Sequence, residues 1–323
     1  MKIRTAFQQG FLKVFSYYKI IGVVFIINLF AALIVALPFA SSLDKVTAQN
    51  PNREDLVQFD YAWWQEIHFN ADGLLQTLRP SLSSGIGTLF DNLELLLTGH
   101  FGEIGWQLFT LAIVYLLVTA FLNGGIISLY LDEKRKFTLQ RFFSYCGQHV
   151  NHMSAIAFTA VLVFLAFYKL LHPALFSIPE QLSYSTLDST VVWFSTLCIF
   201  LLLFFLMIFL DIIFDYSKII VIHEKKDSSW LSIWLAIKFF FKNFTGVIGL
   251  YLNVLILSAI VMTLGGFLLS LISANSAGVI IVTIILQQIL ILVQIIFRLS
   301  FYSTAVSLYT GRTMQKKIKK IKR

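Results

Sequence analysis

The stretch VVWFSTLCIFLLLFFLMIFLDIIFDYSK (Val191–Lys218) decides the fold, because it opens with twenty residues that carry no charge. A helix of roughly 20 apolar residues crosses a bilayer core about 30 Å thick. Asp211, Asp215 and Lys218 then follow at i, i+4 and i+7, so they share one helix face. The stretch predicts a membrane-spanning helix that ends in a polar stripe.

The whole chain has the composition of a membrane protein. Of its 323 residues, 58% are hydrophobic and 13% are charged, about half the charged share of a soluble domain. Apolar runs long enough to span occur at about 20–42, 106–131, 154–172, 190–222, 247–273 and 279–310. They are continuous rather than alternating, which excludes a barrel. The predicted fold class is an all-α membrane protein with six transmembrane helices, forming a single integral membrane domain over residues 1–323.

The basic residues predict the orientation. They gather before the first span, between the second and third, between the fourth and fifth, and after the sixth. Besides the basic tail, they are Lys2, Arg4, Lys13, Lys19, Lys134, Arg135, Lys136, Arg141, Lys225, Lys226, Lys238 and Lys242. The positive-inside rule places both termini in the cytoplasm. The first apolar run is longer than the roughly 7–15 residues of a signal peptide core, so we expect an uncleaved helix. Cys146 and Cys198 are expected to form no disulfide.

Three segments on the predicted inner side are amphipathic and aromatic. They are AFQQGFLKVFSYYK (6–19), LQRFFSYCGQHVNH (139–152) and SWLSIWLAIKFFFKNF (229–244), each before an odd-numbered span. Helices of this kind lie in the headgroup plane. The alternative is that each is a cytoplasmic extension of the following span.

The inner ends of the even-numbered spans resemble one another. NGGIISLYLDEKR, YSKIIVIHEKKD and YSTAVSLYTGR can be aligned on Gly124, Ser217 and Ser303. The spacing predicts a three-fold repeat of roughly ninety residues, each an interfacial helix followed by a helical hairpin. The first repeat carries an extracytoplasmic insertion between its two spans, residues 43–105, which includes an amphipathic helix at 86–97.

A polar layer is expected near the cytoplasmic side of the fourth and sixth spans. Gln287, Gln294 and Arg298 form a stripe at i, i+7 and i+11, and the repeat places Arg298 at the depth of Asp211. Polar stripes within spans normally face the bundle interior or a water-filled cavity. The candidate layer comprises Asp211, Asp215, Lys218, Gln287, Gln294 and Arg298. We expect Asp211 or Asp215 to pair with Arg298 as a structural tie; a substrate or proton path is the alternative.

Two glycine pairs and the basic tail complete the candidate residues. Gly124, Gly125, Gly265 and Gly266 are expected to allow close helix packing, with a hinge as the alternative. The cytoplasmic tail, residues 312–323, carries Lys316, Lys317, Lys319, Lys320, Lys322 and Arg323. At about 1 kcal/mol per basic residue, these side chains are expected to contact anionic lipid. Nucleic acid is not an expected partner.

Catalytic motifs are absent from the sequence. No phosphate-binding loop, zinc-protease signature, nucleophile elbow or paired CxxC occurs. Cys146, His149 and His152 recur every three residues, but three ligands without a second cluster are a weak metal signal. We expect no catalytic residues, no metal and no cofactor.

The segment NGGIISLYLDEKRKFTLQRFF (Asn123–Phe143), together with the six spans and interfacial helices, resembles a broad group of bacterial membrane proteins. The group includes the membrane domain of some glycerophosphodiester phosphodiesterases and related families of unknown function. No phosphodiesterase domain accompanies the pattern here. The resemblance therefore implies a fold and the bacterial cytoplasmic membrane, not an activity.

These observations favour a non-enzymatic membrane protein that acts as a lipid-interacting scaffold or as an accessory subunit of a membrane complex. Its expected partners are anionic lipids and a membrane protein or a second copy of the chain. The alternative is a transporter or lipid-moving permease that uses the polar layer. An intramembrane enzyme ranks third.

Overall fold

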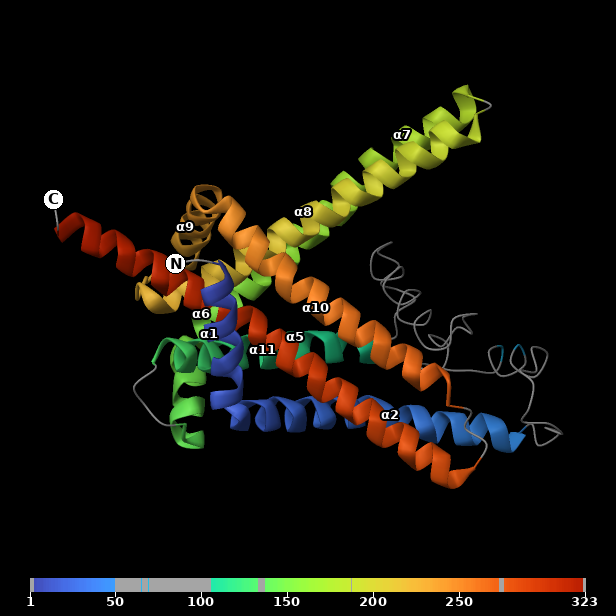
Figure 1. The fold of residues 1–323 in the computed structure, drawn as a ribbon. Helices are drawn as coiled ribbons and strands as arrows, with labels where there is room; N and C mark the ends of the chain where they lie inside the picture. The colour runs from blue at the N-terminus through green and yellow to red at the C-terminus, as the bar shows by residue number, and fades with distance from the viewer. Residues whose placement is uncertain are drawn as a thin grey trace. The chain divides into compact units, whose positions relative to one another are not determined.

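The computed structural model describes residues 3–49, 65, 69, 106–132, 137–186, 188–272 and 276–321, and every element in these ranges is a helix (Figure 1). Five helices are long and apolar enough to cross a membrane, or six if the bent pair Ile3–Ser16 and Tyr18–Ile34 is one span. The predicted all-helical class is confirmed, and five or six helices are candidates for membrane spans. The exact number of six stays a prediction.

The long helices cover the apolar stretches of the sequence. They are α2 (Tyr18–Gln49), α5 (Trp106–Leu131), α6 (Leu139–Ala166), α8 (Ser189–His223), α10 (Phe244–Ser270) and α11 (Ala277–Ile321). With 35 residues, α8 is roughly 50 Å long at about 1.5 Å per residue, which exceeds a hydrocarbon core of about 30 Å. The predicted long fourth helix is therefore present, and its length is greater than a hydrocarbon core is thick.

The third apolar stretch runs from α6 through a π-helical segment, η2 (Phe167–Leu171), into α7 (His172–Ser185). Pro173 accounts for the π-helical segment, because it lacks the N–H that would bond to the carbonyl of Lys169. The His172 ring stacks between Tyr168 and Phe176, with ring centroids 4.9 and 4.5 Å away. The helix therefore continues past the proline.

The chain divides into two compact units. The first, which we call the core unit, comprises Met1–Ile26, Thr119–Val161 and Phe200–Arg323, and the second comprises Ile27–Val118 and Leu162–Ile199. Within the second unit, the Tyr115 hydroxyl donates to Oδ1 of Asn28 at 3.3 Å and links α5 to α2. The candidate polar residues all lie in the core unit, so its packing decides their surroundings.

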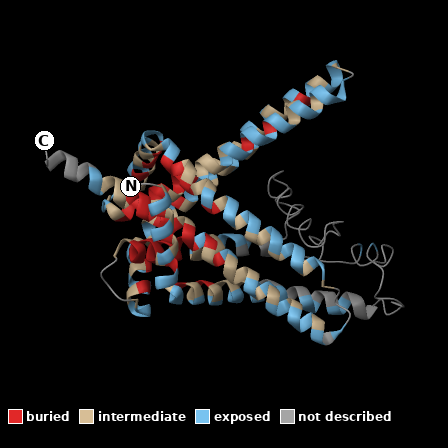
Figure 2. Ribbon diagram, viewed as in Figure 1, coloured by how far each residue is buried: buried red, intermediate tan, exposed pale blue. Residues whose placement is uncertain are grey.

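Three helix ends form the centre of the core unit. Residues 122–130 of α5 are all buried, as are most of residues 212–222 of α8 and 299–309 of α11 (Figure 2). A helix segment buried on every side must be surrounded by other helices. These three segments are also the ones that can be aligned on Gly124, Ser217 and Ser303.

The N-terminal helix α1 (Ile3–Ser16) packs on the buried segment of α11, residues 299–309. It buries Ala6, Gly10 and Val14, one residue per turn. Its closest approach to α11 is at Gly10, where an added Cβ would lie 2.5 Å from Cα of Thr304. The Ser303 hydroxyl donates to the Gly10 carbonyl oxygen at 2.8 Å. The first and last helices of the chain are therefore in direct backbone contact.

The start of α6 packs on the end of α5 in a similar way. Phe142 and Cys146 are buried there, and a Cβ on Gly125 would overlap Sγ of Cys146 and lie 2.8 Å from Cε2 of Phe142. Unlike the expected separate interfacial helix, this segment continues into the span as one helix. No proline or glycine follows Gly147 within α6, so nothing in the sequence interrupts it.

The third amphipathic segment is a separate helix, α9 (Ser229–Lys242), which packs on the end of α8. Its N-terminus is capped by the Ser228 side chain, which accepts from the Leu231 N–H. The Phe240 ring lies 4.9 Å from the Phe209 ring of α8. At Asn243 the backbone leaves the helical region, with φ −126° and ψ 27°, and α10 starts at the next residue.

Two predicted features lie largely outside the described residues. The insertion 43–105, including its helix at 86–97, is described only through residue 49, which still belongs to α2, and at single positions beyond it. The backbone of the tail is helical to Ile321, as part of α11, but its side chains from residue 316 onward lie outside the description. The proposed lipid contacts of the tail stay predictions.

Candidate functional site

A buried ion pair occupies the centre of the predicted polar layer. Asp215 and Lys218 lie one turn apart on α8, with Oδ1 and Nζ separated by 2.8 Å. Their side chains are 13% and 15% exposed, respectively. Two charges are unfavourable away from solvent unless they stay paired. Removing one partner of such a pair typically lowers the stability of a protein by about 3–5 kcal/mol, because the other charge is left alone.

Lys218 also contacts α11. Its ammonium lies 3.5 Å from the Tyr302 hydroxyl and 5.4 Å from the centroid of the Tyr302 ring. Tyr302 is itself buried, so the ammonium is held between a carboxylate and an aromatic ring. Such an arrangement stabilises a cation away from water, and it ties α8 to α11.

Asp211 links the layer to a third helix. Its carboxylate accepts a hydrogen bond from the Tyr251 hydroxyl of α10. The Tyr251 ring in turn packs on Phe301 of α11, with centroids 4.7 Å apart. Asp211 and Asp215 therefore lie in a network that joins α8, α10 and α11, and each carboxylate has a donor.

The predicted polar stripe of α11 is exposed rather than in the interior. Gln287, Gln294 and Arg298 are exposed on α11, whereas Ile295, Phe297 and Leu299 of the same helix are buried. The expected location of this stripe in the interior is therefore wrong for the two glutamines. Arg298 lies close enough to Asp215 and Tyr302 to interact with both electrostatically. Its direct pairing with Asp211 or Asp215 stays a prediction.

The four candidate glycines have unequal surroundings. Added Cβ atoms would overlap Cys146 at Gly125 and Leu290 at Gly265, and at Gly124 the Cβ of His149 would be 3.1 Å away. At Gly266 a Cβ would meet no atom within 4 Å, so close packing does not account for that glycine. Close approach of helices thus explains three of the four positions.

Cys146 and the nearby histidines do not assemble as metal ligands. Across the described residues, no group of three His, Cys, Asp or Glu side chains is placed to hold a metal ion. Cys146 is buried against α5, and His152 instead lies 3.2 Å, by its Nδ1, from the Ser229 hydroxyl of α9.

Sequence reasoning missed Tyr251 and Tyr302, although one signal was present. The pair Tyr302-Ser303 of α11 repeats the pair Tyr216-Ser217 of α8. Aligning the serines could have identified Tyr302 as a core residue on the same layer. No comparable signal exists for Tyr251, because its contact depends on the rotation of α10 about its axis.

The arrangement can hold helices together, since its charges and phenols are engaged with one another. It contains carboxylates, an ammonium and phenols from three helices, without the nucleophile–base pairing that acyl or phosphoryl transfer uses. Comparison of the chain with known protein families, curated proteins and solved structures finds no match.

Proposed function

We propose that this chain is a non-enzymatic protein of the bacterial cytoplasmic membrane, serving as a lipid-interacting scaffold or as an accessory subunit of a membrane complex. The observation that carries the proposal is the internal pairing of Asp215 with Lys218 at 2.8 Å in the core. A transport path needs charged groups that exchange partners with a substrate or with water. Charges that are buried and engaged with neighbouring helices favour a structural role over the permease alternative.

The amphipathic helices support contact with the lipid headgroups. Trp230 and Trp234 of α9 are 71% and 54% exposed, and the Lys238 ammonium lies 5.0 Å from the Trp234 ring. Exposed tryptophans next to lysines are typical of the membrane–water interface. In the proposed orientation, with both termini in the cytoplasm, α9 lies at the inner leaflet. The three-fold repeat remains part of this proposal, supported by the three buried helix ends and the amphipathic segments packed on them.

The exposed glutamines of α11 support a protein partner. Gln287 and Gln294 lie within a candidate span, Gly278–Gln315, yet the chain leaves their side chains exposed. A polar side chain within a span prefers a hydrogen-bonding partner on another helix. We propose that another membrane helix, from a partner protein or from a second copy, covers this face.

The test is native mass spectrometry of the full-length chain after extraction in mild detergent. The wild type is expected to carry a partner or a second copy in fixed stoichiometry, and Gln287→Leu/Gln294→Leu is expected to lose it. Gln315→Leu is the matched control, because Gln315 is exposed on the same helix at the end of the span. A wild type that runs as a bare single chain, or a double variant that keeps its partner, would argue against this proposal.

A further inference from the structure

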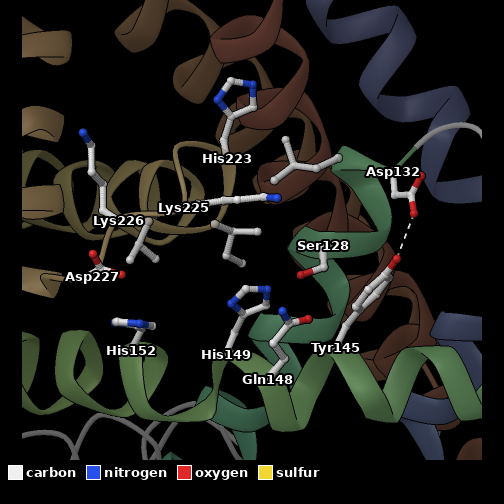
Figure 3. Close-up of a pocket in the computed structure, with 13 residues that line it drawn as sticks. Ser128, Asp132, Tyr145, Gln148, His149, His152, His223, Lys225, Lys226 and Asp227 are labelled. Carbon is white, nitrogen blue, oxygen red and sulfur yellow. Dashed lines mark hydrogen bonds between the residues drawn. The ribbon is translucent and has the colours of Figure 1, made fainter.

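A cavity of about 680 Å³ lies in the core unit, and none of the polar-layer residues is part of its lining. Its walls are the end of α5, the start of α6 and the turn that joins α8 to α9 (Figure 3). Polar side chains from all three segments line it, including Ser128, Gln148, His149, His152 and Lys225.

The turn after α8 places Lys225, a residue with a side chain, in a left-handed backbone conformation. The N–H of Lys226 bonds to the Val221 carbonyl at 3.1 Å, and the N–H of Lys225 lies 3.4 Å from the Ile222 carbonyl. This is the Schellman pattern that ends many helices, and its left-handed position is usually glycine. Here Lys225 occupies that position, with φ at 49°. A left-handed backbone disfavours a residue with a Cβ by roughly 1–2 kcal/mol, a cost that glycine would avoid.

The Lys225 ammonium is directed into the cavity. Figure 3 shows it reaching from the turn toward Ser128, while Gln148 and His149 point into the same space from α6. Within the described part of the chain, no carboxylate forms an ion pair with Lys225. Its neighbour Lys226, in contrast, lies 3.7 Å from Glu224. Lys225 is therefore a cation available to a ligand, and Lys226 also lines the cavity.

Two carboxylates and two lysines line the cavity, so the formal charges of these four side chains cancel. The Asp132 carboxylate already accepts a hydrogen bond from the Tyr145 hydroxyl at 2.8 Å. Asp227 stands on the other side of the turn, near His152 (Figure 3). An ammonium with nearby amide, imidazole and hydroxyl groups is a donor set suited to phosphate oxygens.

We propose that this cavity binds a phosphate group, with Lys225 as its cation and His149 and Gln148 as further donors. The inference deepens the proposed function and rests on it, because the proposed orientation places the cavity at the level of the inner headgroups. Basic pockets between helices on the cytoplasmic side are places where phospholipid headgroups bind. The same donor set would also accept a free phosphate ester, so the experiment separates the two sources.

The experiment is calorimetric titration of the full-length chain in neutral detergent with dioctanoyl phosphatidylglycerol and, separately, with glycerol 3-phosphate. Saturable binding of the lipid at one site is expected. Lys225→Asn should weaken that binding by roughly tenfold or more, the loss expected for one hydrogen bond to a charged group. Asparagine is well tolerated at a positive φ, so this variant should unfold at the wild-type temperature or above it. Weaker binding would then not reflect a damaged fold.

Lys45→Gln is the matched control. It removes one positive charge from α2, where Lys45 is exposed and does not line the cavity. It should bind the lipid as the wild type does. Equal weakening in both variants would overturn the inference, because attraction would then come from overall charge. Absence of saturable binding by either probe would also overturn it. Equal binding of glycerol 3-phosphate would support the phosphate site and assign its ligand to a soluble ester. Neither probe depends on the glutamine face, so this inference can fail while the partner proposal stands.

Discussion

At Gly10, where α1 meets α11, an added Cβ would overlap backbone atoms of the neighbouring helix. A Cβ at Gly10 would lie 2.5 Å from Cα and Cγ2 of Thr304 and 2.7 Å from its backbone nitrogen. Two of these three atoms belong to the backbone and cannot rotate away. In Gly10→Ala, α1 must therefore move away from α11, which also weakens the 2.8 Å hydrogen bond from Ser303.

The size of the effect follows from two opposing terms. Overpacking of this kind costs about 1–3 kcal/mol, and alanine gains about 1 kcal/mol over glycine within a helix. We expect Gly10→Ala to be less stable than the wild type by up to roughly 2 kcal/mol. Gly22→Ala is the matched control, since a Cβ there would meet nothing within 4 Å. It should gain about 0.5–1 kcal/mol.

The assay is thermal unfolding of each full-length variant in the same detergent, followed by the loss of monodisperse protein. Gly10→Ala should unfold below the wild type and Gly22→Ala at or above it. Thr304→Ser should not rescue Gly10→Ala, because it removes only Cγ2 and leaves the backbone contacts. Equal midpoints for the two alanine variants would refute the close contact of α1 with α11.

Three further predictions concern the contacts of the core unit. Gly125→Ala should lower the unfolding temperature, and adding Cys146→Ala should restore part of the loss, because the overlap there is with a side chain; no recovery in the double variant would count against this packing. Tyr251→Phe should destabilise the protein by about 0.5–1.5 kcal/mol through loss of its hydrogen bond to Asp211, and an unchanged midpoint would show that the bond adds nothing. Exchanging Asp211 and Arg298 should recover stability relative to either single reversal; if it recovers none, the predicted pairing of these side chains is wrong.

Hydropathy could predict the candidate spans because a membrane-crossing segment must be apolar along its own length, which is a local property of the sequence. Lipid offers no hydrogen bonds, so each crossing segment must be apolar over about 20 residues, whatever its neighbours are. The long α8 and the Asp211–Lys218 stripe could be recognised on the same basis. The alignment of Gly124, Ser217 and Ser303 also identified the helix ends that the structure buries.

The sequence was less informative where the answer depends on how helices are rotated. The spacing of Gln287 and Gln294 defines a face of α11 but not what that face meets, and the structure leaves it exposed. The contact of Gly10 with Thr304 joins the two ends of the chain, which no local pattern reveals. Lys225 gave no signal either, because its left-handed backbone becomes visible only once α8 is seen to end at His223.

The sequence also did not show which amphipathic segments are separate helices. α9 ends before α10 begins, whereas α6 continues as one helix. Both segments are amphipathic, and both precede a span. Asn243 interrupts the helix between α9 and α10, whereas neither glycine nor proline follows His152 within α6. Amphipathic character alone therefore did not decide whether a segment is a helix of its own.

The central proposal is that Asp215 and Lys218 neutralise each other within the fold, as a structural role requires, rather than exchange partners with a substrate. The most direct measurement compares the unfolding midpoint and the partner stoichiometry of Asp215→Leu, Lys218→Met and the double variant. If the two charges mainly neutralise each other, each single variant loses about 3–5 kcal/mol, while the double variant loses less than either single, because an apolar pair can replace a buried ion pair. A double variant as unstable as the singles, or one that folds but no longer assembles, would contradict the account.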